Sequence, residues 1–396
     1  MPFDFLGFVS QYKWIILFYL AVVILLVIYR KRLEFQAKII ILLRTKIGLS
    51  FMDFCARKFR EWIILLGYVG TGVGFIGMGL IAFLLIKNLY DVFTNPQAIS
   101  GVSLVIPGVK VPGLGILPFW YWLVAIFIIA VVHEWAHGIV ARAHNIEVKN
   151  TGIVFLGPIL GAFVEPDEKK MKKEKDIVQY SVLAAGSFSN ILLAILAVLL
   201  LNFAFMPLHQ SMVEPLGFSF ASYAKEDGPA AIAKLIPNTV ITGLNGKNTA
   251  SFEEFSSELT NLKPGEKITV QTKDKEYPLT LAQSPQDSRR AYLGIQEIKN
   301  EFTIKEKYQQ GLLYGIYHVL DWFTGFLRWL FLLSSGIGLF NLLPLPIVDG
   351  GRMLQTFLHR LKGDEHGEKR YRQISLLILL ILLLNLFAPL LTKVIF

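Results

Sequence analysis

The sequence predicts an all-α polytopic membrane protein with about six transmembrane helices and an inserted α+β domain outside the cytoplasm. Of its 396 residues, 54% are hydrophobic and 17% are charged, and the mean hydropathy is +0.51. A typical soluble domain has about 25% charged residues. The apolar residues lie in long runs, as in membrane spans, whereas residues 214–300 are polar throughout.

Six apolar runs have about the length that a membrane span needs. They are residues 14–29, 62–86, 117–141, 178–206, 329–348 and 374–395. The first run is followed by Arg30, Lys31 and Arg32 and has little positive charge before it. A cleavable signal has its charges in front, so this run predicts an uncleaved span with its N-terminal end outside.

Lysine and arginine are distributed unevenly between these runs. Nine lie in residues 30–60, seven in 142–175, six in 352–372 and one in 88–116. Cytoplasmic loops carry the excess of Lys and Arg, so the three basic segments are expected in the cytoplasm, with both termini and residues 207–310 outside. The net charge of +9 therefore indicates contact with the lipid bilayer, and no nucleic-acid partner is expected.

Two apolar stretches differ from simple spans. Residues 150–165 are too short to cross a bilayer and contain Gly157-Pro158, which favours a re-entrant, membrane-dipping hairpin; an apolar loop is the alternative. Residues 311–328 carry His318 and Asp321, which favours an interfacial amphipathic helix, with a seventh span as the rival.

The polar segment 214–300 has the signals of a small α+β domain. Asn245-Gly246 predicts a tight hairpin turn, and Ser251 begins a short helix with a capping-box pattern. The predicted division of the chain is 1–116 (two spans and a basic loop), 117–206 (core spans), 214–300 (the inserted domain), 307–353 (amphipathic helix and third core span) and 354–396 (a loop and the last span).

The strongest local motif is His133-Glu134-Trp135-Ala136-His137, near the end of the third apolar run. Helical residues at i and i+4 share one face, so His133 and His137 can bind one Zn²⁺. Glu134 can then take a proton from an activated water and return it to a leaving amine. Ionisable groups inside a span are costly and usually functional; the alternative is two interfacial histidines beside a glutamate.

A catalytic zinc needs a third protein ligand and an open position. Asp349 is the candidate, because the predicted topology places it at the same depth as His133 and His137. Pro344 and Pro346 interrupt the helix before it, and the glycines after it allow another backbone to approach closely. The alternative is that Asp349 only caps the next helix.

Three segments together resemble the site-2 protease family of intramembrane metalloproteases. They are HEWAH at 133–137, AAGSFSN at 184–190 and NLLPLPIVDGGRM at 341–353, in the order that the family has them. The resemblance covers the core spans. It implies one Zn²⁺ bound by His133, His137 and Asp349, with Glu134 as the catalytic residue.

Two asparagines are further candidates. The resemblance implies that Asn190 binds substrate or stabilises an oxyanion, with a helix–helix hydrogen bond as the alternative. Before Asn190 the chain has Gly186-Ser187 where the family commonly has Gly-Pro, which affects the expected helix shape there. Asn341 lies among apolar residues and could support the metal ligands, with packing as the alternative.

The inserted segment resembles a PDZ domain in GPAAIAKLIPNTVITGLNGKNTASFEEF at 228–255. PDZ domains bind chain ends by adding a strand to a sheet edge, and the family resemblance implies that this one screens substrates outside the membrane. The hairpin at 150–165 could similarly hold an unwound substrate strand, because a substrate helix shields its own carbonyl groups.

The predicted function is zinc-dependent hydrolysis of peptide bonds in or beside the transmembrane segment of a membrane-anchored protein, as in regulated intramembrane proteolysis. Proteases of prenylated proteins are a rival, but they use a glutamate as third ligand, and no fitting intramembrane glutamate follows His137. The other rivals are a non-catalytic membrane scaffold that binds peptides through its PDZ-like domain, and a transporter, which would show an internal repeat.

Overall fold

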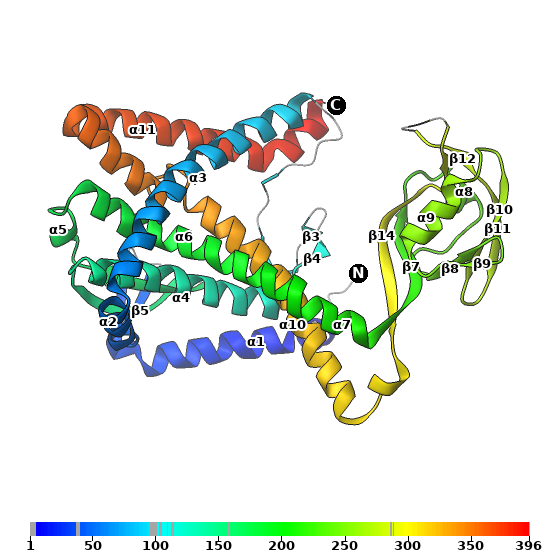
Figure 1. The fold of residues 1–396 in the computed structure, drawn as a ribbon, viewed down its shortest axis with the longest axis horizontal. Coiled ribbons are helices and arrows are strands. Elements are labelled where there is room, and N and C mark those ends of the chain that lie inside the picture. The colour runs from blue at the N-terminus through cyan, green and yellow to red at the C-terminus, as the bar shows by residue number, and fades with distance from the viewer. Residues whose placement is uncertain are drawn as a thin grey trace. The chain divides into compact units, whose positions relative to one another are not determined.

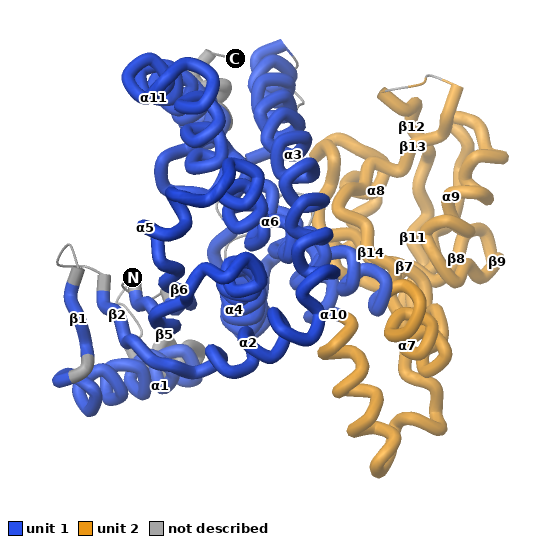
Figure 2. The backbone as a smooth tube through the Cα atoms, turned by 60° about the vertical axis from the view of Figure 1, so that its left-hand side comes forward, with its two compact units in different colours: residues 1–201, 325–396 blue, residues 202–324 orange. Residues whose placement is uncertain are grey.

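The computed structural model describes residues 5–36, 40–94, 101–102, 105–108, 110–111, 115–156, 159–285, 287 and 289–395. The chain divides into two compact units, drawn in different colours in Figure 2. Unit 1 consists of residues 1–201 and 325–396, and unit 2 consists of residues 202–324. The predicted hairpin tip, Gly157-Pro158, lies outside the described residues.

Long apolar helices dominate unit 1 (Figure 1). The helices that begin in or lie wholly within it are α1 (Phe5–Ile28), α2 (Leu49–Lys58), α3 (Arg60–Thr94), α4 (Phe119–Ala143), α5 (Glu168–Met171), α6 (Asp176–Leu200) and α11 (Asp349–Ile395). After α6 come a π-helical segment, Leu201–Phe205, and α7 (Met206–Met212); α10 (Gly311–Phe340) runs from unit 2 into unit 1.

Among the described residues, five helical segments are long and apolar enough to cross a membrane. They are Arg60–Thr94, Phe119–Ala143, Asp176–Met212, Gly311–Phe340 and Asp349–Phe387. The apolar part of α1, Lys13–Ile28, is shorter. The prediction of several apolar spans is thus confirmed, while a sixth span at α1 stays a prediction.

The boundaries predicted around the fifth span are wrong. Residues 311–328 do not form a separate amphipathic helix, because α10 continues without a break to Phe340. Residues 341–348 are non-helical, since Pro344 and Pro346 have no N–H to donate to a helix. The segment before the last span, predicted as a loop, is helical within α11, with a break at Gly363 (φ 73°, ψ 166°).

Unit 1 also contains a sheet, so the membrane part is not all-α as predicted. Strands β1 (Leu33–Gln36), β2 (Ile40–Thr45), β5 (Val148–Leu156) and β6 (Ile159–Pro166) form an antiparallel sheet in the order β1-β2-β5-β6. The stretch predicted as a hairpin is the β5–β6 pair. Its partner strands come from the basic segment after the first helix, whose short strands gave no clear alternating pattern.

An ion pair joins β2 to the edge strand β6. The guanidinium of Arg44 donates to Glu165 at 2.7 Å, and the amide of Asn150 donates to the same carboxylate at 2.9 Å. The hydrogen bond from Arg44 lowers the pKa of the Glu165 carboxyl. Strand β6 is therefore fixed to the sheet near its C-terminal end.

Unit 2 is built around a second antiparallel sheet with the order β11-β10-β8-β7-β14, to which β9 adds beside β8. Its buried core includes Phe218, Phe220 and Phe255. The predicted turn is confirmed: Asn245 and Gly246 both have positive φ between β8 and β9. The Ser251 side chain accepts from the Glu254 N–H, which confirms the predicted helix cap.

The bounds of the remaining elements are as follows: β3 (Lys110–Val111), β4 (Gly115–Ile116), β7 (Val213–Tyr223), α8 (Pro229–Ile232), β8 (Ile241–Leu244), β9 (Lys247–Asn248), α9 (Phe252–Thr260), β10 (Lys267–Thr272), β11 (Glu276–Thr280), β12 (Ala282–Gln283), β13 (Ala291–Tyr292) and β14 (Ile295–Ile304).

Glycines on one side of α3 let the helix pack closely in unit 1. A Cβ on Gly74 would lie 2.8 Å from Met353 Cε, and a Cβ on Gly77 would lie 2.5 Å from Leu342 Cδ1. The two neighbours belong to the first turn of α11 and to the segment just before it. Helix α3 thus supports the position at which α11 begins, as small residues do in membrane helix packing.

We expect Gly77→Val to destabilise the protein by about 1–3 kcal/mol, the usual cost of overpacking. Gly79→Val is the matched control, because a Cβ on Gly79 has no neighbour within 4 Å. The measurement is the midpoint of thermal unfolding in detergent. Equal midpoints for the two variants would show that close packing at Gly77 does not contribute to stability.

Candidate active site

Two histidines of α4 meet on one face of that helix. His133 and His137 are one turn apart, and their Nε2 atoms are 3.2 Å from each other. Each side chain is only 12% exposed. The i, i+4 spacing therefore brings two nitrogen donors to one point inside the helical unit.

Asp349 approaches the same point from α11. Its Oδ2 atom lies 3.1 Å from Nε2 of His133 and 3.3 Å from Nε2 of His137. This oxygen is buried and makes no hydrogen bond, although both contacts are within ion-pair distance. A buried carboxylate oxygen without a hydrogen bond is costly unless a cation shares the site.

The segment before α11 holds Asp349 in place through its backbone. The N–H of Gly350 donates to the carbonyl of Asn341 at 2.8 Å. A Cβ on Gly350 would lie 2.2 Å from the Leu342 carbonyl oxygen, and one on Gly351 would lie 1.8 Å from that of Leu345. The close backbone approach predicted for this glycine pair is confirmed, because no side chain fits there.

The outer nitrogens of the two imidazoles also have partners, both from α6. Nδ1 of His137 lies 2.6 Å from the carbonyl oxygen of Val182. A carbonyl can only accept, so Nδ1 carries a proton, and in the neutral imidazole Nε2 then keeps its lone pair for a metal ion. Such an outer partner is what orients a metal-binding histidine.

Asn190 occupies the equivalent place beside His133. Its Nδ2 lies 3.1 Å from Nδ1 of His133, and its Oδ1 is buried without a hydrogen-bond partner. A half-turn of the amide would let Oδ1 accept a hydrogen bond from the N–H at Nδ1, which would satisfy both groups and leave Nε2 of His133 free to bind a cation.

Gly186 of α6 provides the room for the two imidazoles. A Cβ at this position would lie 2.4 Å from Nε2 of His137 and 2.5 Å from Nε2 of His133. Helix α6 therefore passes directly beside the donor atoms. Any larger residue at Gly186 would displace the histidines.

Glu134 faces a small cavity of about 120 Å³ that His137 and Asp349 also line. The backbone N–H of Val164, on strand β6, donates to its Oε2 at 3.1 Å. This hydrogen bond fixes the orientation of the Glu134 carboxyl group toward the cavity. The edge strand of the sheet thus takes part in forming this site.

The structure brings His133, His137, Asp349 and Asn190 together. The backbone carbonyl of Asn341 accepts from the N–H of Gly350, and a role for its side chain stays a prediction. Sequence reasoning missed the part played by Gly186 and by Val164. The glycine lies within a motif that we singled out, so a small residue facing the histidines was a usable signal. The backbone donor of Val164 leaves no signal in the sequence.

Among the described residues, one group could hold a metal ion, namely His133, His137 and Asp349, whose ligand atoms all lie within 4.8 Å of one another. Two imidazole nitrogens and one carboxylate oxygen are a donor set typical of catalytic zinc. The hydrogen-bond-free Oδ2 of Asp349 and the space that Gly186 leaves fit a bound cation.

Several known proteins are similar to this chain. The uncharacterized protein MJ0971 of Methanocaldococcus jannaschii is 26% identical over 368 residues, which are 90% of this chain and 87% of that protein. Protease RseP of Photorhabdus luminescens is 36% identical over 66 residues, 16% of this chain and 29% of that one. Zinc metalloprotease RasP of Oceanobacillus iheyensis is 35% identical over 81 residues, 18% of this chain and 19% of that one. The chain thus aligns with less than a third of each named protease.

One solved structure to which this chain was matched is the PDZ domain of the SdrC-like protein from Listeria monocytogenes. It is 23% identical, covers 20% of this chain and 86% of its own, and has a TM-score of 0.19. The PDZ-like character of residues 214–300 stays a prediction.

A longer match, to a family model, establishes the family of this chain. A family model described as Peptidase family M50 matches residues 121–386, a range that holds the histidine motif, the AAGSFSN segment and Asp349. The match covers well over half of the chain and agrees with the resemblance to site-2 proteases. This chain belongs to peptidase family M50.

Proposed function

We propose that this chain is a zinc-dependent protease that hydrolyses peptide bonds within or beside the transmembrane segments of membrane-anchored proteins. The observation that carries the proposal is the convergence of His133, His137, Glu134 and Asp349 within helices that are apolar enough to span a membrane. Membership of a peptidase family supports it. Such cuts in regulatory proteins would act in regulated intramembrane proteolysis, after a first cut elsewhere.

One zinc ion would be held by Nε2 of His133, Nε2 of His137 and Oδ2 of Asp349. When bound, it would supply Lewis acidity toward water and toward the scissile carbonyl group. The chain's own part is to hold the two imidazoles in the tautomer whose Nε2 is unprotonated. The Val182 carbonyl does this for His137, and the Asn190 amide would do it for His133.

Glu134 is the proposed acid and base. Hydrolysis adds a hydroxyl group to the carbonyl carbon and a hydrogen to the nitrogen, and the bond between carbon and nitrogen breaks. The Glu134 carboxylate takes the proton that the attacking water loses and returns it to the leaving nitrogen. The N–H of Val164 donates a hydrogen bond to one oxygen of the Glu134 carboxylate. This bond fixes the orientation of the group and therefore the position of its other oxygen.

Strand β6 is the proposed docking place for substrate. It lies at one end of its four-stranded sheet, and its residues Val164 and Pro166 line the small cavity with Glu134. A substrate helix must unwind before its carbonyl groups can be attacked. An extended substrate beside β6 would present successive carbonyl groups to the site.

The proposed orientation follows the distribution of basic residues. The segments 30–60, 142–175 and 352–372 would face the cytoplasm, which places the zinc site near that side of the membrane. The PDZ-like segment 214–300 would lie outside and screen substrates there.

We expect Glu134→Gln to lower the cleavage rate of a single-span model substrate by at least about 100-fold while zinc remains bound, because the amide cannot accept the proton. Glu147→Gln, the same change at an exposed residue beyond α4, is the control. Cleavage in liposomes would be followed by mass spectrometry, which also maps the cut. Undiminished cleavage by Glu134→Gln would refute the assignment of the acid and base.

We expect Gly186→Ala to lower zinc affinity at least about tenfold, because a Cβ displaces both imidazoles from the geometry that zinc requires. Ser187→Ala is the neighbouring control, since the Ser187 hydroxyl is buried without a hydrogen bond and its loss removes no contact of that kind. Competition with a chromophoric chelator measures the affinity. Equal affinities for both variants would contradict the placement of α6 beside the metal.

We expect Asn190→Leu to weaken zinc binding by about 10- to 100-fold, the usual effect of removing an outer partner of a metal-binding histidine. Asn190→Asp keeps an acceptor for Nδ1 of His133 and is expected to restore much of the affinity. The visible spectrum of the Co²⁺-substituted protein reports the ligand geometry directly. If both variants bind zinc like the wild type, Asn190 does not orient His133.

A further inference from the structure

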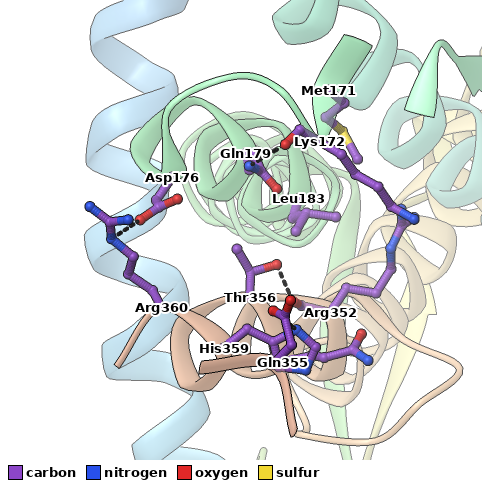
Figure 3. A pocket seen from close by; sticks show the side chains of 11 residues that line it. Met171, Lys172, Asp176, Gln179, Leu183, Arg352, Gln355, Thr356, His359 and Arg360 are labelled. Carbon is purple, nitrogen blue, oxygen red and sulfur yellow. Dashed lines mark hydrogen bonds and ion pairs between the residues drawn. The ribbon is translucent and has the colours of Figure 1, made fainter. Parts of the chain in front are cut away.

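A second, larger cavity opens beside the proposed zinc site. Its volume is about 670 Å³, and its walls come from α5, α6 and α11 and the turn between α5 and α6. Figure 3 shows polar side chains around it, with Arg360 and Asp176 on one side and Arg352 and Lys172 on the other. We call it the outer cavity.

The outer cavity and the small cavity of Glu134 share three lining residues. These are Met171, Leu183 and Arg352, of which Arg352 alone is charged. Arg352 follows Asp349 by three positions on α11, so its side chain starts from the same helical face one turn away. Of the three residues that the two cavities share, Arg352 therefore provides the only positive charge at the boundary between them.

One product of the proposed reaction has the charge that such a cation attracts. Breaking a peptide bond yields a carboxylate and an ammonium group at neutral pH. When zinc is bound, its charge offsets that of the Asp349 carboxylate, but the Glu134 carboxyl also lines the small cavity and, when ionised, repels a newly formed carboxylate. Movement toward a fixed positive charge relieves this repulsion.

The partner that now holds Arg352 is easily exchanged. Its Nη2 lies 3.2 Å from Oε1 of Glu168, in a pair whose side chains are 43% and 61% exposed. Exposed pairs of this kind contribute little to stability. The planar guanidinium can instead bind another carboxylate through two parallel hydrogen bonds.

The other charges of the outer cavity largely pair with one another. Arg360 lies 3.2 Å from Asp176, and His359 lies 3.5 Å from Asp364. Lys172 adds a further cation to the lining. Among the described residues, Arg352 and Lys172 are thus the cations of this lining for which no ion pair with another lining residue is found.

We propose that the outer cavity binds the newly formed terminal carboxylate of the cleaved peptide, with Arg352 as the principal cation and Lys172 as an auxiliary one. This inference rests on the proposed function, because the carboxylate arises from peptide hydrolysis. It assigns to the chain a product site next to the site of cleavage.

The test measures binding rather than cleavage. The probe is a fluorescein-labelled Ala-Leu-Ala-Leu peptide with either a free C-terminal carboxylate or a C-terminal amide. Fluorescence anisotropy gives its affinity for the full-length chain in detergent, before and after treatment with a zinc chelator. We expect the acid to bind at least about tenfold more tightly than the amide, with and without zinc.

Arg352→Met should abolish the preference for the acid and leave binding of the amide unchanged. Arg352→Lys keeps the positive charge but lacks the planar guanidinium that can make two parallel hydrogen bonds. It should therefore retain part of the preference for the acid. Arg370→Met, on an exposed part of the same helix, is the matched control. If Arg352→Met does not fold, the test rests on two other measurements. These are the preference of the wild type for the acid over the amide, and the decrease of that preference in Arg352→Lys.

Three outcomes would overturn the inference. They are equal affinity for acid and amide, an acid preference that Arg352→Met leaves intact, and an acid preference that disappears with the zinc, since the metal would then be its source. Because binding requires no turnover, a failure here is separate from a failure of Glu134→Gln to stop cleavage.

Discussion

The central constraint on this molecule is the cost of placing ionisable groups among apolar helices. His133, Glu134, His137 and Asp349 lie where little water can solvate them, and an isolated charge there is expensive. The free-energy cost of burying them is limited only if they pair with one another, form hydrogen bonds with backbone groups, or bind a shared cation. The structure meets this requirement at one point, where α4, α6 and α11 come together.

Close backbone approach is what makes that meeting possible. Gly186 leaves room for two imidazoles, and Gly350 and Gly351 let the segment before α11 fold back on itself. Glycines of α3 support the same segment from another side. The donor atoms are thus positioned by helices and by a tightly folded segment, which suits a site whose geometry must be kept within a fraction of an ångström.

The sequence predicts the long apolar helices and the meeting of His133, His137 and Asp349, because the signals for them are local patterns. Apolar runs define spans, and the i, i+4 spacing places His133 and His137 on one face. The sheet of β1, β2, β5 and β6 was missed because its strands pair across segments distant in the chain. The place of Gly186 beside the imidazoles and of Arg352 beside both cavities was missed for a similar reason, since both arise from contacts between helices.

The most direct test of the proposed zinc site is zinc K-edge X-ray absorption on the purified full-length protein, together with its zinc content. We expect one zinc per chain, with nitrogen and oxygen ligands at about 2.0–2.2 Å and the scattering pattern of two imidazoles. In Asp349→Ala the oxygen ligand or the metal itself should be lost. A wild-type protein that binds no zinc, or a zinc spectrum without imidazole ligands, would contradict it.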